Sequence, residues 1–182
     1  MDGRLKLVAL TAVVAGMAAA GTAAIAGGGN DIREHLTGYQ EDPQAISTTG
    51  KGTFQAQIDE RRQEISYKLR YADLEGAVQQ AHIHFGGRAQ SGGISAFLCS
   101  NLGNGPAGTQ ACPPAPATVT GTIRPADVIG PAAQGITAGQ FDELVQAIRA
   151  GVTYANVHTS MYQGGEIRAQ IDRKHRGGHD GR

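Results

Sequence analysis

The sequence predicts an all-β domain: an antiparallel immunoglobulin-like or Greek-key sandwich or barrel with one short helix. Short segments alternate apolar and polar residues with the period of a strand, and glycine, proline and aspartate separate them. The clearest is EISYKLRYADL, 64–74, in which the apolar Ile65, Tyr67, Leu69 and Tyr71 alternate with polar residues. The 27 glycines fit a fold with many turns and bulges.

Seven strands are predicted, and they occupy residues 52–59, 64–74, 78–85, 93–99, 118–124, 153–158 and 165–172. The segment ITAGQFDELVQAIRAG, 136–151, predicts the helix. Thr137 is its expected N-cap, and Gln140 completes a capping box. The apolar stripe of this helix should pack against the sheet, and nothing in it indicates chemistry.

The first residues have the features of a signal peptide. Arg4 and Lys6 precede an apolar run rich in small residues, and Ala24-Ile25-Ala26 has the pattern of a cleavage site. An uncleaved membrane anchor is the alternative, but glycine and alanine dilute the run. We therefore expect residues 1–26 to be removed and the protein to be secreted or periplasmic, with no membrane span after signal removal.

The remaining chain has the length of a single domain. We assign residues 36–172 to this domain, 27–35 to an N-terminal linker and 173–182 to a disordered basic tail. Residues 27–172 contain 10 Lys and Arg against 14 Asp and Glu, which gives −4, whereas the tail carries +3 from four basic residues and one acidic residue. An acidic domain argues against nucleic acid as a partner.

Cys99 and Cys112 are the only cysteines. In an oxidising compartment, an isolated pair across a loop of glycine, asparagine and proline is expected to form a disulfide. A thiolate metal site is the alternative, but no C-x-x-C motif is present.

Two of the predicted strands carry histidines on the side opposite their aliphatic residues. In QQAHIHFGG, His82 and His84 point to one side of the strand, because alternate side chains share a face. In TYANVH, His158 and Asn156 likewise lie opposite the aliphatic residues. If the two strands are neighbours, three imidazoles converge on one polar face of the sheet, which avoids the cost of burying them against the core.

Three convergent imidazoles are suitable ligands for copper or zinc. Asn156, Glu166 or Thr159 would fix the ring tautomers by accepting the free N–H groups, and an ion should be released below about pH 6.5, where imidazole becomes protonated. The alternative is that the histidines bond to backbone carbonyls without a metal. Glu166 and Arg168 are also candidates for ion pairs with a neighbouring strand.

Three stretches carry a family resemblance: LTGYQEDP, AHIHFG and the long run ITAGQFDELVQAIRAGVTYANVHTSMYQGGEIRAQI. Together they resemble the CHRD domain, over about residues 36–171. The resemblance implies an immunoglobulin-like or barrel-like β fold, an extracytoplasmic location and no assigned enzymatic activity. Ala169 stands where the family usually has glycine.

The histidines also resemble part of the copper–zinc superoxide dismutase pattern, in which an H-x-H strand and a late histidine hold copper. An arginine on the last strand of those enzymes guides the anion, and Arg168 occupies the corresponding place. The sequence departs from that pattern because no bridging histidine and no cluster of zinc ligands follows AHIHFGG.

Three hypotheses for the function follow. The leading one is a secreted, non-catalytic CHRD domain that binds a ligand, an ion of copper or zinc among the candidates, through His82, His84 and His158. The second is a copper-dependent redox enzyme with a dismutase-like site. The third is a structural or adhesive module whose histidines only form hydrogen bonds. The extracellular ligand or protein partner is not identified by the sequence.

Overall fold

The structure is a computed structural model that describes residues 31–172. Its strands are β1 (Asp31–Thr37), β2 (Lys51–Asp59), β3 (Glu64–Ala72), β4 (Val78–Phe85), β5 (Gly93–Ser100), β6 (Ala117–Ile123), β7 (Thr153–Thr159) and β8 (Ile167–Ile171). Its helices are α1 (Phe141–Arg149) and the short 3-10 helices η1 (Gly38–Gln40), η2 (Pro125–Asp127) and η3 (Ala132–Gln134). None of the helices in this part of the chain has the length and apolar character needed to cross a membrane.

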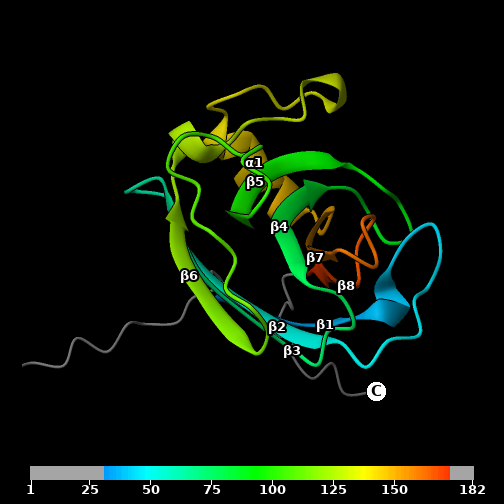
Figure 1. Cartoon of the computed structure of the whole chain (residues 1–182). Helices are drawn as coiled ribbons and strands as arrows, with labels where there is room; N and C mark the ends of the chain where they lie inside the picture. Colours follow the sequence, from blue (N-terminus) through cyan, green and yellow to red (C-terminus); the bar gives the residue numbers. More distant parts are fainter. Residues whose placement is uncertain (1–30, 173–182) are drawn as a thin grey trace, which may run out of the picture.

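All eight strands belong to one antiparallel sheet in the order β5-β4-β7-β8-β1-β2-β3-β6. The sheet curls into a nearly closed barrel, so that β5 and β6 approach each other at its two ends (Figure 1). This architecture confirms the predicted all-β fold with a single α-helix.

The core lies inside the barrel, where the apolar half of each alternating strand is buried. On β3, for example, Ile65, Leu69 and Tyr71 are almost completely buried, whereas Ser66 and Arg70 are exposed. The apolar side of α1 belongs to the same buried cluster as these strand residues. Burial of apolar surface is therefore the main term that holds the sheet in its curved form.

The two ends of the sheet are joined by side chains rather than by a backbone ladder. The amide of Gln110 donates to the carbonyl of Leu98 on β5 and to the carbonyl of Thr120 on β6. The hydroxyl of Tyr67, from β3, also donates to Leu98. Gln110 lies in the loop that the disulfide between Cys99 and Cys112 closes. The loop between β5 and β6 thus closes the barrel.

Strand β1 was not expected from the sequence, which assigned residues 31–35 to the N-terminal linker. They pair with β2 along the whole of β1, and Ile32 is buried in the core. The alternation is interrupted by Glu34, which occupies a position with the parity of the core residues Ile32 and Leu36. That charged residue hides the strand from a search for alternating apolar residues. The predicted signal peptide and the predicted tail lie outside the described residues.

The helix is shorter than expected and begins at Phe141 rather than after Thr137. Gly139 has a φ of +85°, which no helical residue adopts, so the chain turns sharply just before the helix. The backbone N–H of Thr137 does donate to the Gln140 side chain at 2.6 Å, which is one half of the expected capping box. This hydrogen bond stabilises the turn in front of the helix.

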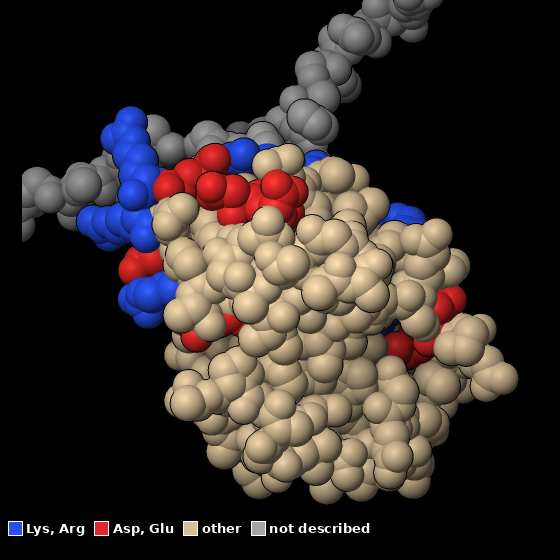
Figure 2. Space-filling model, turned by 90° about the horizontal axis from the view of Figure 1, so that it is seen from above, with Lys and Arg blue, Asp and Glu red and all other residues tan. Residues whose placement is uncertain are grey.

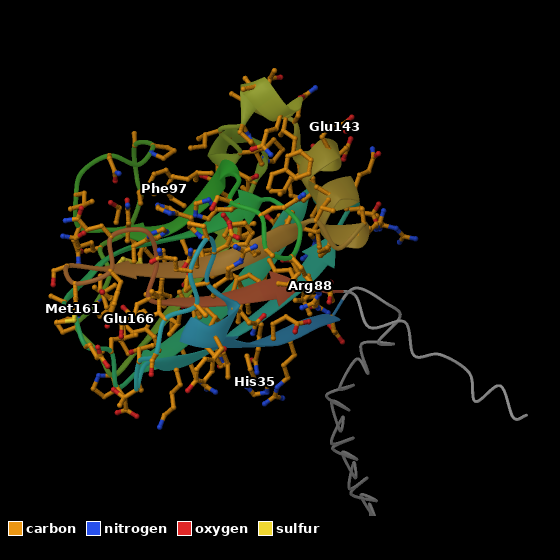
Figure 3. The ribbon with its side chains drawn as sticks, turned by 90° about the vertical axis from the view of Figure 1, so that its right-hand side faces the viewer. His35, Arg88, Phe97, Glu143, Met161 and Glu166 are labelled. Atoms are coloured by element: carbon orange, nitrogen blue, oxygen red, sulfur yellow. A yellow bond between two sulfur atoms is a disulfide. The ribbon has the colours of Figure 1, made fainter. Side chains whose placement is uncertain are left out.

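Loops cover the outer face of β7 and β8, and Glu166 holds several of them. Its buried carboxylate accepts hydrogen bonds from the hydroxyls of Thr48 and Thr159 and from the backbone N–H groups of Glu75 and Gly76. These donors lie in three separate segments of the chain. Glu166 is therefore a buried residue that holds three segments of the chain together. Glu143, by contrast, lies on the exposed side of α1 (Figure 3).

We predict that Glu166→Ala destabilises the domain by about 3 kcal/mol or more, because four donors lose a charged acceptor and some of them stay buried. This corresponds to a fall in the melting temperature of roughly 10 °C. Thermal unfolding followed by circular dichroism measures it, with Glu143→Ala as the control. Equal melting temperatures for the two variants would contradict the role assigned to Glu166.

Candidate metal centre

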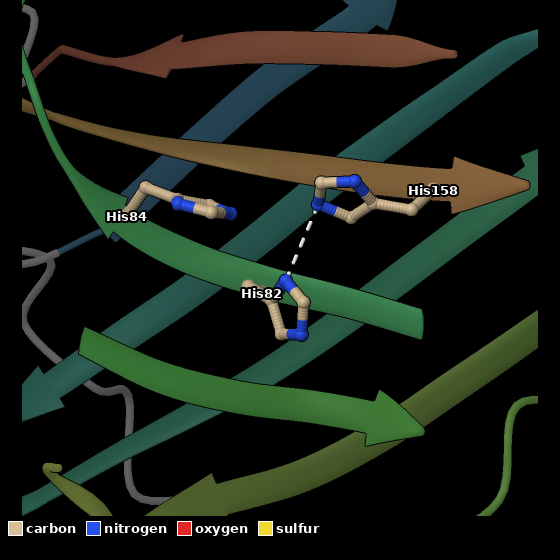
Figure 4. A group of neighbouring side chains, drawn as sticks. All are labelled: His82, His84 and His158. Atoms are coloured by element: carbon tan, nitrogen blue, oxygen red, sulfur yellow. Dashed lines mark hydrogen bonds between the residues drawn. The ribbon is translucent and has the colours of Figure 1, made fainter. Parts of the chain in front are cut away.

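The three histidines lie on the outer side of the barrel wall, on neighbouring strands. His82 and His84 belong to β4, and His158 belongs to β7, which pairs with β4. Their neighbours in sequence, such as Ile83 and Val157, point into the core. The pairing of β4 with β5 shifts register next to both histidines of β4, and such bulges change the direction of side chains. All three rings gather in one place, as Figure 4 shows.

The rings are buried, although the sequence argument placed them on the polar side of the strands to avoid the cost of burial. The exposed fractions are 0% for His82, 7% for His84 and 6% for His158. The ring of Phe97, on β5, packs edge-on against His82 at a centroid distance of 4.4 Å, and the ring of Tyr154 stacks parallel to His84 at 4.8 Å. Aromatic side chains and loops therefore cover a face that strand alternation alone marks as polar.

Backbone carbonyls fix two of the three rings. Nδ1 of His84 lies 2.9 Å from the carbonyl of Gly92, and Nδ1 of His158 lies 2.9 Å from the carbonyl of Gln163. A carbonyl can only accept, so both Nδ1 atoms carry the proton and both Nε2 atoms hold a free lone pair. This is the arrangement by which second partners orient imidazoles that bind a metal.

One nitrogen of each ring faces the other two rings, and in the metal-free domain Nδ1 of His82 donates a hydrogen bond to Nε2 of His158. Nδ1 of His82 lies 3.2 Å from Nε2 of His158, and one nitrogen from each of the three rings falls within 4.8 Å of the others. Nε2 of His84 is buried without a partner among the described residues. Two nitrogens bound to one tetrahedral ion at 2.0–2.1 Å stand about 3.4 Å apart. His82 and His158 already have this spacing, and His84 would have to move inward.

Burial keeps the cluster neutral. Burial, together with a smaller effect of the neighbouring imidazoles, lowers the pKa of His82 to about 2 and that of His84 to about 4. Burial also lowers the pKa of His158. Neutral imidazole is the form that binds a metal. Protons therefore compete for these nitrogens only at a pH well below the value of 6.5 that the sequence suggested.

Arg168 acts on the site through a loop. Its guanidinium is 2% exposed and donates to the carbonyls of Gly87 and Gln90, and it lies 3.5 Å from the centroid of the Tyr154 ring. The hydroxyl of Tyr154 in turn accepts from the N–H of Gly92, whose carbonyl holds His84. Arg168 and Tyr154 together fix the segment that orients one ligand.

The other predicted neighbours have different roles. The hydrogen bonds of Glu166 go to Thr48, Thr159, Glu75 and Gly76, so it accepts from no imidazole in the described part of the chain. Asn156 lies beside His82 in the register of β4 and β7, but its amide donates to Glu41 at 3.3 Å. Carbonyls of Gly92 and Gln163 take the place that Asn156, Glu166 or Thr159 was expected to occupy.

Glu41 is a site neighbour that sequence reasoning missed. Burial raises the pKa of its carboxyl to about 8, although Arg168 and Asn156 both act to lower it. Its Oε1 atom is buried without a partner in the described structure. A single glutamate in a loop forms no recognisable pattern, and only the closeness of LTGYQEDP to a family motif marked this segment.

The metal-free domain should lose stability as the pH falls. Below pH 6.5 His82 and His84 take up protons in the unfolded chain but not in the folded domain, which costs up to about 1.4 kcal/mol per histidine and pH unit, and His158 acts in the same direction. Glu41 has the opposite effect, because it binds a proton in the folded domain up to about pH 8. We expect a net loss of roughly 2 kcal/mol between pH 6.5 and 5, and a larger one in Glu41→Gln.

Urea unfolding in the presence of a chelator measures this change. If Glu41→Gln were equally stable at the two pH values, the histidines would not be buried in neutral form.

The comparisons with known proteins agree with this architecture. Residues 32–171 match the family model of the CHRD domain, and this match covers most of the chain. Comparison with curated proteins and with solved structures gave no match. The stretches that carry the resemblance, AHIHFG and the run through His158 and Arg168, are the ones that build the histidine cluster and its cover. The chain belongs to the CHRD domain family.

Proposed function

We propose that this CHRD domain is a non-catalytic binding module that holds one ion of copper or zinc through His82, His84 and His158. The observation that carries the proposal is the convergence of three neutral imidazoles, of which two have their second nitrogen fixed by a carbonyl. Imidazole is a preferred ligand of both metals, and three histidines with an open fourth position form a known type of zinc site.

A purely structural role explains the cluster less well. Nε2 of His82 and Nε2 of His84 are both buried and have no hydrogen-bond partner among residues 31–172. Each buried polar atom without a partner costs about 1–3 kcal/mol. A bound ion would satisfy Nε2 of His84 directly. It would bind His82 through Nδ1, so Nε2 of His82 would stay without a partner. The unpartnered Nε2 of His84 is thus the atom that favours a metal over a purely structural role.

A dismutase-like enzyme is not favoured by the environment of Arg168. An arginine that guides an anion needs a free guanidinium, whereas Arg168 is buried and donates to two backbone carbonyls. Phe97 and Tyr154 also cover two of the rings. Binding of an ion fits this closed arrangement better than rapid exchange of substrates.

Export from the cell is part of the proposal. The segment that ends at Ala26 has the pattern of a signal peptide. CHRD is an extracellular domain family, and the disulfide between Cys99 and Cys112 is of the kind that persists in an oxidising compartment.

The metal proposal is tested by titrating the purified domain with Zn(II), Cu(II) and Cu(I) at pH 7. We expect one ion per chain, and His84→Ala should weaken binding by at least about 100-fold, because a ligand is lost. His35→Ala is the matched control, since His35 is exposed on β1 and lies outside the cluster. Equal affinity in wild type, His84→Ala and His35→Ala would leave the cluster with a structural role only.

Export is tested by N-terminal sequencing of protein recovered from outside the cytoplasm of its own host. We expect the mature chain to begin at Gly27, immediately after the A-x-A pattern. A chain that still begins at Met1 and stays in the membrane fraction would contradict export in soluble form.

A further inference from the structure

The outer face of β1, β2, β3 and β6 carries a cluster of cations, of which Arg33 and Arg70 are exposed and Lys68 is half-buried. The register aligns two rows of side chains across these strands. One row is His35, Thr53, Arg70 and Thr118, and the next is Arg33, Gln55, Lys68 and Thr120. We call the cations of these rows, Arg33, Lys68 and Arg70, the cationic face. Strands β1, β2, β3 and β6 lie on the side of the barrel away from β4 (Figure 1).

The charges of the cationic face are available to a partner. The ion pairs among residues 31–172 involve other cations, and Arg33, Lys68 and Arg70 take part in none of them. The domain around them is acidic, with a net charge of −4 over residues 27–172. By contrast, the surface seen from above in Figure 2 is largely free of charged residues, with its charges gathered along its margin. The cationic face is therefore a local feature.

Acidic residues of the same strands lie at the other end of the sheet face. Asp59 and Glu64 occupy the last paired position of β2 and β3, and Glu64 is paired with Arg124. Asp31 lies at the same end of β1. No acidic residue stands within the two rows themselves, but Asp31 lies two positions from Arg33 in the next row of β1. Lys51, beside the first row, is paired with Asp73.

A hollow of about 600 Å³ lies beside the row of His35, Thr53, Arg70 and Thr118. Lys51, Arg70 and His35 provide its polar rim, and Pro116 and Ala117 provide apolar surface. Its volume falls in the range of sites that hold small organic groups. The hollow combines an apolar patch with cations and with the hydroxyls of Thr53 and Thr118.

We propose that the cationic face and this hollow bind a single chain of acidic polysaccharide. Cations stand about 7 Å apart along a strand and about 10 Å apart between β1 and β3, which suits carboxylate or sulfate groups on successive sugars. Threonine and glutamine side chains between them match sugar hydroxyls. The apolar surface of Pro116 and Ala117 matches the C–H face of a sugar ring.

Nucleic acid fits this surface less well. The aromatic residues of β3, Tyr67 and Tyr71, are buried on the opposite face and are not available for stacking with bases. A narrow polysaccharide chain needs only the local positive charge and the hollow.

The test uses the mature protein with heparin and polygalacturonate as sulfated and carboxylated probes, and with uncharged dextran and a single-stranded oligonucleotide for comparison. We expect binding to at least one acidic polysaccharide, weakened at least tenfold by the double substitution Lys68→Gln/Arg70→Gln. The logarithm of the binding constant falls linearly with the logarithm of the salt concentration, and we expect the slope of this line to decrease by about one for each cation removed. A loss with heparin alone identifies sulfate as the recognised group, and a loss with polygalacturonate identifies carboxylate.

Two matched controls separate the cationic face from other positive charges. Arg61→Gln/Arg62→Gln removes two exposed arginines from the turn between β2 and β3 and should leave affinity unchanged. Glutamine in place of Arg173, Lys174, Arg176 and Arg182 tests the basic tail in the same way. Melting temperatures verify that each variant is folded. Absence of binding at low salt, an equal loss in either control, or tighter binding to the oligonucleotide would each overturn the proposal.

Discussion

Each buried polar side chain on the outer face of β7 and β8 needs a hydrogen-bond partner, and the loops supply these partners. Glu166 takes backbone N–H groups and hydroxyls from three segments, Arg168 gives its N–H groups to the segment 86–92, and Gln170 donates to Gly86 and Gly151. A loop that supplied no partner would leave a buried charge or amide unsatisfied. The positions of the loops are therefore set by the polar residues of the last strand, and the closed environment of the histidines follows from them.

That environment explains why the same three histidines behave differently from exposed ones. Loop segments bring the carbonyls of Gly92 and Gln163 to the rings, and these carbonyls select the tautomer. The aromatic rings of Phe97 and Tyr154 remove water, which lowers the pKa of the cluster. The orientation of the three rings and their neutral state thus have a common origin. Both depend on the loops and aromatic side chains that cover the rings, and residues of β5 and β8 keep these in place.

The sequence predicted those parts of the molecule that leave a periodic trace. Alternation identified seven strands, and the parity of His82, His84 and His158 predicted that they share a face. Strand β1 was not predicted because Glu34 interrupts its alternation of apolar and polar residues. The predicted start of α1 was too early because the sequence pattern does not show the positive φ of Gly139, which turns the chain just before the helix. Burial of the histidines depends on side chains of other strands, such as Phe97 of β5. Backbone carbonyls, which are present at every residue, leave no signal at all.

The closure between β5 and β6 has a consequence for how copies of this domain coexist at high concentration. The edge strands of an open sheet present unpaired N–H and C=O groups that can pair with another molecule, and this leads to aggregation. Here Gln110 and Tyr67 occupy the carbonyls of Leu98 and Thr120 on the two edges, so these groups are no longer free to recruit a foreign strand. One glutamine in an irregular loop thereby contributes to the colloidal stability of the domain.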